Sequence, residues 1–157
     1  MRKTILVLMT LMPVALNAQT YDFDMTKQQP VYSDSQGYGY DVLPAPDKKK
    51  PAEPFYFSVK VPDGNYLVKV VLGGKKNSNT TVRAEGRRLM MDNITTKRAK
   101  DTQEVSFTVN KRTPLIDEKN RVKIKDREKA YFTWDDKLTL EFNGDMPAVK
   151  HIHIEKA

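Results

Sequence analysis

The sequence predicts an all-β protein built as an antiparallel β-sandwich of about nine short strands. Apolar and polar side chains alternate along much of the chain, turn residues separate the alternating runs, and helical periodicity is scarce. Such alternation indicates strands with one buried face, because successive side chains point to opposite sides of a strand. Many short strands without a long helix favour two packed antiparallel sheets.

Four segments show the alternation most clearly. FYFSVKVP (55–62) and YLVKVVL (66–72) flank the turn residues Asp63-Gly64, and this arrangement predicts a β-hairpin. EVSFTVNK (104–111) and KLTLEFNG (137–144) repeat the pattern. Shorter strands are expected at 21–24, 81–85, 87–92, 121–125 and 150–155.

The first residues predict a secretory signal peptide. Arg2 and Lys3 precede an apolar run of about 12 residues, and small Ala18 suits cleavage before Gln19. A retained membrane anchor is the alternative, but the run is shorter than the roughly 20 residues that span a bilayer. We therefore expect residues 1–18 to be removed and residues 19–157 to form one domain, periplasmic or extracellular.

Charge and cysteine content narrow the possible partners. The full chain carries a net charge of +7, and loss of Arg2 and Lys3 leaves +5. This excess favours anionic partners: acidic polysaccharide, an anionic membrane surface or nucleic acid, of which export disfavours nucleic acid. The chain has no Cys, which excludes disulfides, thiol chemistry and a lipid-modified cysteine after the signal.

The last strand, HIHIEK, places two histidines on one face. Alternation puts His151 and His153 on one side and Ile152 and Ile154 on the other. A metal site would need a third ligand. These are the only two His residues of the chain, so that ligand would have to be an Asp or Glu of a neighbouring strand. The sequence therefore favours two solvent-facing imidazoles and no metal site.

Catalysis is not indicated by the acidic or serine residues. Glycosidic hydrolysis uses two carboxyl groups that converge on one bond, whereas the adjacent Asp135 and Asp136 should point to opposite faces. A turn before the strand at 137–143 explains the two acids better. The chain also lacks a G-x-S-x-G nucleophile motif.

Two aromatic stretches suit contact with a glycan. GYGYD places Tyr38 and Tyr40 on one face of an extended segment, and YFTWDD brings Trp134 next to Asp135. Sugars stack their C–H faces on flat rings while carboxylates accept hydrogen bonds from hydroxyl groups. The alternative is packing of these rings in the core or at a domain interface.

Basic residues cluster in RAEGRRLMMDNITTKRAK, where Arg87 and Arg88 are adjacent. A solvated charged face is one interpretation. The other is recognition of a carboxylate-bearing polymer, because the planar guanidinium group matches a carboxylate with two parallel hydrogen bonds.

Seven stretches together resemble one known domain. They are YDFD, GYGYD, PFYFSVKVPDGNYLVKVVLGG, TTVRAEGRRLM, FTVNKRTPLI, RVKIKDRE and WDDKLTLEFNG. From about Tyr21 to the C-terminus, the chain resembles the N-terminal β-sandwich of bacterial rhamnogalacturonan acetylesterases. The resemblance implies a galactose-binding-like jelly roll. In that family an SGNH esterase domain follows, with a Gly-Asp-Ser block and an Asp-x-x-His pair. The chain stops about where that block should begin, so no catalytic residue is carried over.

The resemblance also bears on cofactors. Sandwiches of that family can hold a structural calcium ion near the first and last strands, where Asp22 and Asp24 are possible oxygen donors here. The side-chain donors are too few to predict the ion, and no cofactor is expected.

Two functional hypotheses follow. The first is a secreted, non-catalytic carbohydrate-binding accessory domain for an acidic pectic glycan such as rhamnogalacturonan, with no nucleic-acid or membrane partner. It uses stacking rings, a hydroxyl-binding carboxylate and two guanidinium groups: Tyr38, Tyr40, Trp134, Asp135, Arg87 and Arg88. The second is a structural domain that packs against and supports an SGNH-type esterase domain, in trans here, as part of a truncated or split rhamnogalacturonan acetylesterase.

Overall fold

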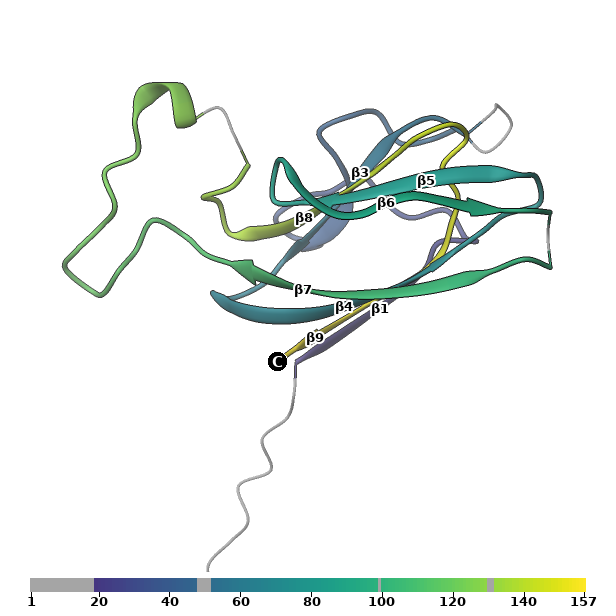
Figure 1. Cartoon of the computed structure of the whole chain (residues 1–157). Coiled ribbons are helices and arrows are strands. Elements are labelled where there is room, and N and C mark those ends of the chain that lie inside the picture. The colour runs from purple at the N-terminus through teal and green to yellow at the C-terminus, as the bar shows by residue number, and fades with distance from the viewer. Residues whose placement is uncertain (1–18, 48–51, 99, 130–131) are drawn as a thin grey trace, which may run out of the picture.

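Two antiparallel sheets face one another in the computed structural model, which describes residues 19–47, 52–98, 100–129 and 132–157 (Figure 1). The predicted signal peptide, residues 1–18, lies outside these ranges. In order across the first sheet, the strands are β1 (Thr20–Asp24), β9 (Val149–Lys156), β4 (Gly64–Leu72) and β7 (Gln103–Lys111). In order across the second, they are β2 (Tyr38–Asp41), β3 (Phe55–Lys60), β8 (Lys137–Asn143), β5 (Ser78–Ala84) and β6 (Arg88–Thr96).

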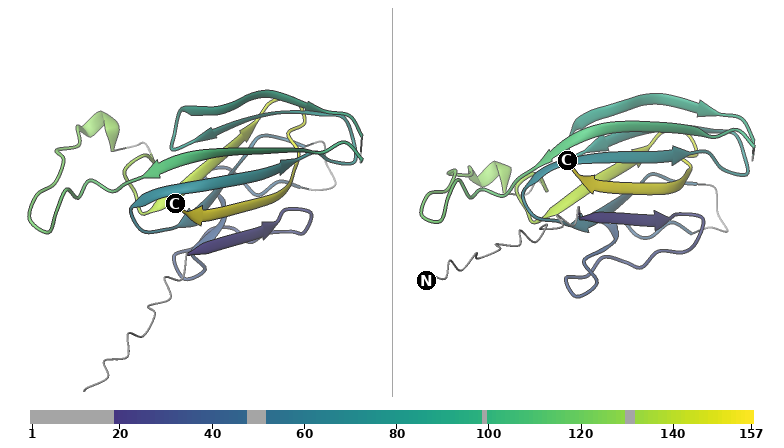
Figure 2. Two further views of the ribbon diagram at one scale, coloured as in Figure 1. Left: turned by 60° about the horizontal axis from the view of Figure 1, so that its bottom comes forward. Right: turned by 90° about the horizontal axis from the view of Figure 1, so that it is seen from below.

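The predicted all-β class and the antiparallel sandwich of about nine strands are confirmed. The chain passes repeatedly from one sheet to the other, so strands that are consecutive in sequence often lie in opposite layers (Figure 2). The described part of the chain has one short 3-10 turn, η1 (Asp126–Glu128), and no α-helix. Within that part, no helix is long and apolar enough to cross a membrane.

The alternating apolar residues form the core between the sheets. Phe57 and Leu140 of the five-stranded sheet and Val68 and Ile152 of the four-stranded sheet have no exposed surface. Each lies directly opposite another apolar residue on the neighbouring strand, as Phe57 does with Leu140 and Val68 with Ile154. Directly opposed residues share a face, so the side of each sheet that carries these residues is largely apolar.

The hairpin predicted around Asp63-Gly64 is wrong. β3 pairs with β2 and β8, whereas β4 pairs with β7 and β9 in the other sheet. The connection carries the chain across the end of the sandwich, and the Asp63 carboxylate accepts hydrogen bonds from the Thr113 N–H group at 2.9 Å and from Lys111 Nζ at 3.0 Å. Alternation identifies the buried face of each strand. It does not identify the sheet to which a strand belongs, because the strands of both sheets bury an apolar face.

The strand predicted at 121–125 is also absent. Residues 112–129 extend beyond the end of the sandwich as a projecting arm, seen in green in Figures 1 and 2. Local hydrogen bonds hold the arm, from the Ile116 N–H to the Asn120 carbonyl and from the Val122 N–H to the Pro114 carbonyl. The strand that replaces it in the total of nine is β2, which lies within the GYGYD stretch.

Candidate ligand-binding site

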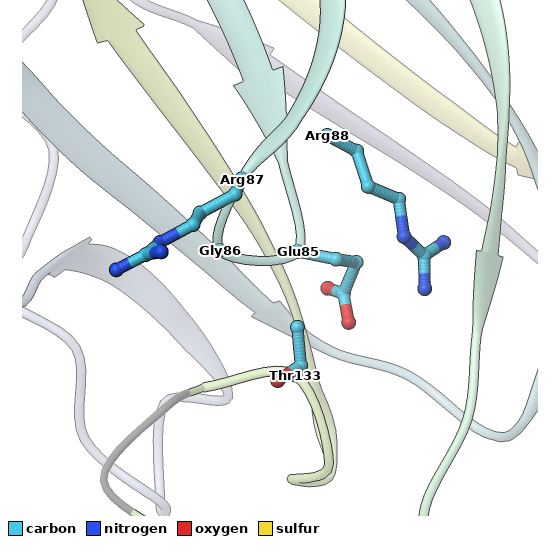
Figure 3. Close-up of a pocket in the computed structure, with 5 residues that line it drawn as sticks. All are labelled: Glu85, Gly86, Arg87, Arg88 and Thr133. Atoms are coloured by element: carbon cyan, nitrogen blue, oxygen red, sulfur yellow. The ribbon is translucent and has the colours of Figure 1, made fainter. Parts of the chain in front are cut away.

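A pocket of about 380 Å³ lies where the β5–β6 turn meets the segment that precedes β8 (Figure 3). The turn supplies Glu85, Gly86, Arg87 and Arg88, and the segment supplies Thr133. The volume falls within the roughly 300–1,000 Å³ typical of small-ligand sites. Two of the six predicted site residues, Arg87 and Arg88, therefore line this pocket.

The turn has a backbone conformation that glycine favours. Glu85 and Gly86 both have positive φ, 51° and 82°. This conformation is uncommon for a residue with a side chain, and at Glu85 it is held by β8. The Glu85 N–H donates to the Thr139 carbonyl at 3.0 Å, and Glu85 Oε1 accepts from the Thr139 N–H at 3.1 Å. Both bonds fix the carboxyl group relative to the sheet.

Glu85 is a buried acid. Its exposed fraction is 2%, and burial raises the pKa of its carboxyl group to about 7. The hydrogen bond from Thr139 opposes the rise, as do the cations of Arg88 and Lys111, whereas the nearby Asp135 carboxyl adds to it. At neutral pH the pocket therefore contains a carboxyl group divided between its protonated and ionised forms.

The two arginines lie on different sides of the turn. Figure 3 shows Arg88 reaching toward the side of Glu85, whereas Arg87 extends away from it. The Arg88 Nη1 group donates to the Asn110 carbonyl of β7 at 2.9 Å, so its guanidinium group is anchored to the opposite sheet. Both guanidinium-bearing side chains therefore line the pocket, but from different sides of the turn.

Trp134 and Asp135 follow Thr133 at the same end of the sandwich. The Arg112 guanidinium group lies 4.8 Å from the centre of the half-buried Trp134 ring, so one ring face already has a partner. Asp135 Oδ1 accepts a hydrogen bond from the Lys137 N–H group at 3.0 Å. This bond belongs to the turn that the sequence predicted before the strand at 137–143. Burial raises the pKa of Asp135. Asp136 instead pairs with Lys60 at 2.8 Å, so the two acids diverge as predicted.

The two predicted tyrosines lie elsewhere, and the expectation for Tyr40 is corrected. Tyr40 is 3% exposed, and its ring packs edge-on against Phe55 and Phe57. Tyr40 lies opposite Phe57 in the β2–β3 pair, so it shares the core face and has no ring face for a sugar. Tyr38 is half-buried against Phe23 at 5.0 Å. β2 is the edge strand farthest from β6, so neither ring belongs to the pocket.

The histidines of β9 face an acid of β1. Asp22 Oδ1 lies 2.9 Å from His153 Nδ1 and 3.4 Å from His151 Nε2, and Glu155 Oε2 lies 3.3 Å from His153 Nε2. Asp24, the other donor considered for calcium, pairs with Lys27 at 3.3 Å. Among the residues that the structure describes, no three His, Asp or Glu side chains are grouped to hold a metal ion.

Sequence reasoning missed three of the residues that line the pocket: Gly86, Thr133 and the buried acid Glu85. For Glu85 the available signal was the Glu85-Gly86 pair where the predicted strands 81–85 and 87–92 meet, because glycine between two strands marks a turn. The burial of Glu85 could not be predicted, because the partner that encloses it, Thr139, lies 54 residues away in the sequence.

Comparison with known proteins adds a distant structural likeness. No protein-family model matches the chain, and no curated protein matches it. Among solved structures, the chain is similar to the crystal structure of protein YxiM from Bacillus subtilis, with 16% identity and a TM-score of 0.47. The match covers 88% of this chain and 40% of that one. A likeness of this size carries no argument about function.

Proposed function

We propose that this protein is a secreted, non-catalytic carbohydrate-binding domain for acidic pectic polysaccharide such as rhamnogalacturonan. The observation that carries the proposal is the pocket at the β5–β6 turn, which is lined by two arginines on different sides of the turn and has a size suited to a sugar residue. The net charge, +7 for the full chain and +5 after loss of Arg2 and Lys3, also favours an anionic polymer.

Arg88 is the main carboxylate-binding group in this proposal. A guanidinium group has five N–H donors, and the bond to the Asn110 carbonyl orients the Arg88 fork. A uronate carboxylate can therefore bind Arg88 without much loss of side-chain entropy. Arg87 extends from the other side of the turn and would contact a neighbouring sugar of the same polymer.

Trp134 and Asp135 extend the binding surface beyond the pocket. Because Arg112 occupies one face of the Trp134 ring, sugar stacking would use the other face. The Asp135 carboxyl accepts one backbone hydrogen bond and retains acceptor capacity for a sugar hydroxyl. A non-catalytic role agrees with Asp135 and Asp136 having different partners, since the pair does not converge on one bond.

Affinity measurements on matched arginine variants test the proposal. We expect Arg88→Ala to weaken binding of a rhamnogalacturonan oligosaccharide at least tenfold, which is about 1.4 kcal/mol. Arg121→Ala removes the same charge from the projecting arm and should leave affinity within about twofold, a difference below roughly 0.5 kcal/mol. Equal losses in both variants would mean that net charge, and not the pocket, attracts the polymer.

The projecting arm favours a second candidate, a structural domain that packs against an SGNH esterase domain in trans. Leu115, Ile116 and Val122 of the arm are 55%, 67% and 40% exposed, and a group of exposed apolar side chains is typical of a protein contact. This candidate predicts that a rhamnogalacturonan acetylesterase catalytic domain binds the wild-type protein and loses affinity for Ile116→Asp. A folded protein that binds this esterase but no oligosaccharide would replace the first proposal with the second.

A further inference from the structure

Glu85 is an acid placed where the proposed ligand is also an acid. It lines the pocket together with Arg87 and Arg88, and among the described lining residues it is the one with a carboxyl group. Figure 3 shows its side chain on the same side of the turn as Arg88. A bound uronate would therefore approach both the guanidinium group that attracts it and a carboxyl group that, when ionised, repels it.

Charged residues of three neighbouring segments act on Glu85. Arg88 belongs to β6, Lys111 to the end of β7 and Asp135 to the segment before β8. Lys111 is 1% exposed, and its Nζ lies 3.0 Å from Asp63 Oδ1, so that cation already has an anionic partner. With Asp135 adding a second carboxyl group, Arg88 is the cation on the Glu85 side of the turn that can compensate an incoming anion.

We propose that the pocket takes up a ligand carboxylate together with one proton, and that Glu85 carries the proton. This inference rests on the proposed function, because it requires that the ligand be a uronate. The proton comes from solvent and no covalent bond changes. Glu85 Oε1 accepts from the Thr139 N–H, so Oε2 is the oxygen that takes the proton and can donate it in a hydrogen bond to the ligand carboxylate.

Because a proton is taken up with the ligand, the affinity for a uronate depends on pH near neutrality. Since burial raises the pKa of Glu85 to about 7, the free pocket is mostly protonated at pH 6 and mostly ionised at pH 8.5. A uronate with an ordinary carboxyl pKa near 4 is ionised at both values. If only the protonated pocket binds, affinity falls about 30-fold between pH 6 and pH 8.5.

Isothermal titration with a rhamnogalacturonan oligosaccharide, in phosphate and in Tris buffer at pH 7.5, measures proton uptake directly from the difference in heat. We expect uptake of more than half a proton per ligand in the wild-type protein. Glu85→Gln retains an oxygen for the Thr139 bond, so we expect it to fold, to bind equally at pH 6 and pH 8.5, and to take up no proton. Glu104→Gln, on the exposed face of β7, should behave as the wild type.

The outcomes separate this inference from the proposed function. Binding by the wild-type protein without proton uptake would overturn the inference and leave the carbohydrate-binding function standing. Proton uptake that persists in Glu85→Gln would assign the proton to another group and overturn it as well. Absence of binding at both pH values, in the wild type and in Glu85→Gln, would overturn both proposals.

Discussion

Replacing Glu85 with Gln should stabilise the protein at alkaline pH and change its stability little at acidic pH. The ionised carboxylate is costly at this position because the side chain is 2% exposed. The protonated acid and the amide are similar in size, and both accept the hydrogen bond from the Thr139 N–H. The substitution therefore removes the ionisation and leaves the packing almost unchanged.

The expected magnitude follows from the pKa of Glu85 in the two states. Its ordinary value of 4.5 applies to the unfolded chain, and burial raises it to about 7 in the folded protein. The folded state binds the proton more tightly, so the stabilisation by protonation is complete below pH 4.5 and is lost as the pH rises through 7. At 1.36 kcal/mol per pKa unit, the total loss is about 3 kcal/mol.

Urea denaturation of the wild type and of Glu85→Gln at pH 4.5, 6.5 and 8.5 measures this loss. The variant should be the more stable protein at pH 8.5, and its advantage should grow by about 3 kcal/mol between pH 4.5 and pH 8.5. Glu104→Gln corrects for a general effect of removing one negative charge. A difference between Glu85→Gln and the wild type that stays constant with pH would refute the reasoning.

Two further predictions concern ion pairs of the sandwich. Asp63→Ala leaves the buried Lys111 ammonium group without its anionic partner and should lower the free energy of unfolding by about 2 kcal/mol in urea titrations. Lys111→Met keeps the apolar stem and removes the charge, so it should lower the free energy of unfolding clearly less. The hydrogen bond to Asp22, together with that to Glu155, raises the pKa of His153, so the stability that this pair adds is full below pH 6.5 and is lost as pH rises through the folded-state pKa. Asp22→Asn should therefore lower the thermal midpoint at pH 5.5 and leave it unchanged at pH 9. The loss at pH 5.5 should correspond to about 0.5 kcal/mol, because the pair is partly exposed. An equal loss at both pH values would contradict this account.

Alternation predicted the buried faces well because it reports a local property of each strand. Phe57 and Val68 are buried whichever sheet their strands join. The same pattern could not show that β3 and β4 belong to opposite sheets, because both sheets line one core and strand pairing depends on residues distant in sequence. GYGYD was interpreted as a ligand contact because Tyr38 and Tyr40 share one face of an extended segment, but that face can equally be the core face, as it is for Tyr40.

The candidate site was predicted in part for a similar reason. Arg87 belongs to a short turn and Trp134 to the segment before a clear strand, so both were expected at strand ends. The end of β5 and the start of β8 meet because these two strands pair, which brings Ala84 opposite Leu140. This pairing could not be predicted from either segment alone. The buried carboxyl group of the pocket depends on the same pairing, since Thr139 of β8 holds Glu85 by a hydrogen bond.

The carbohydrate-binding proposal is tested most directly by calorimetric titration of the purified protein with acetylated and unacetylated rhamnogalacturonan oligosaccharides at two salt concentrations. We predict saturable binding that weakens at the higher salt concentration, because the contacts pair guanidinium groups with carboxylates near the surface. A folded protein that gives no heat of binding at millimolar oligosaccharide would contradict the account.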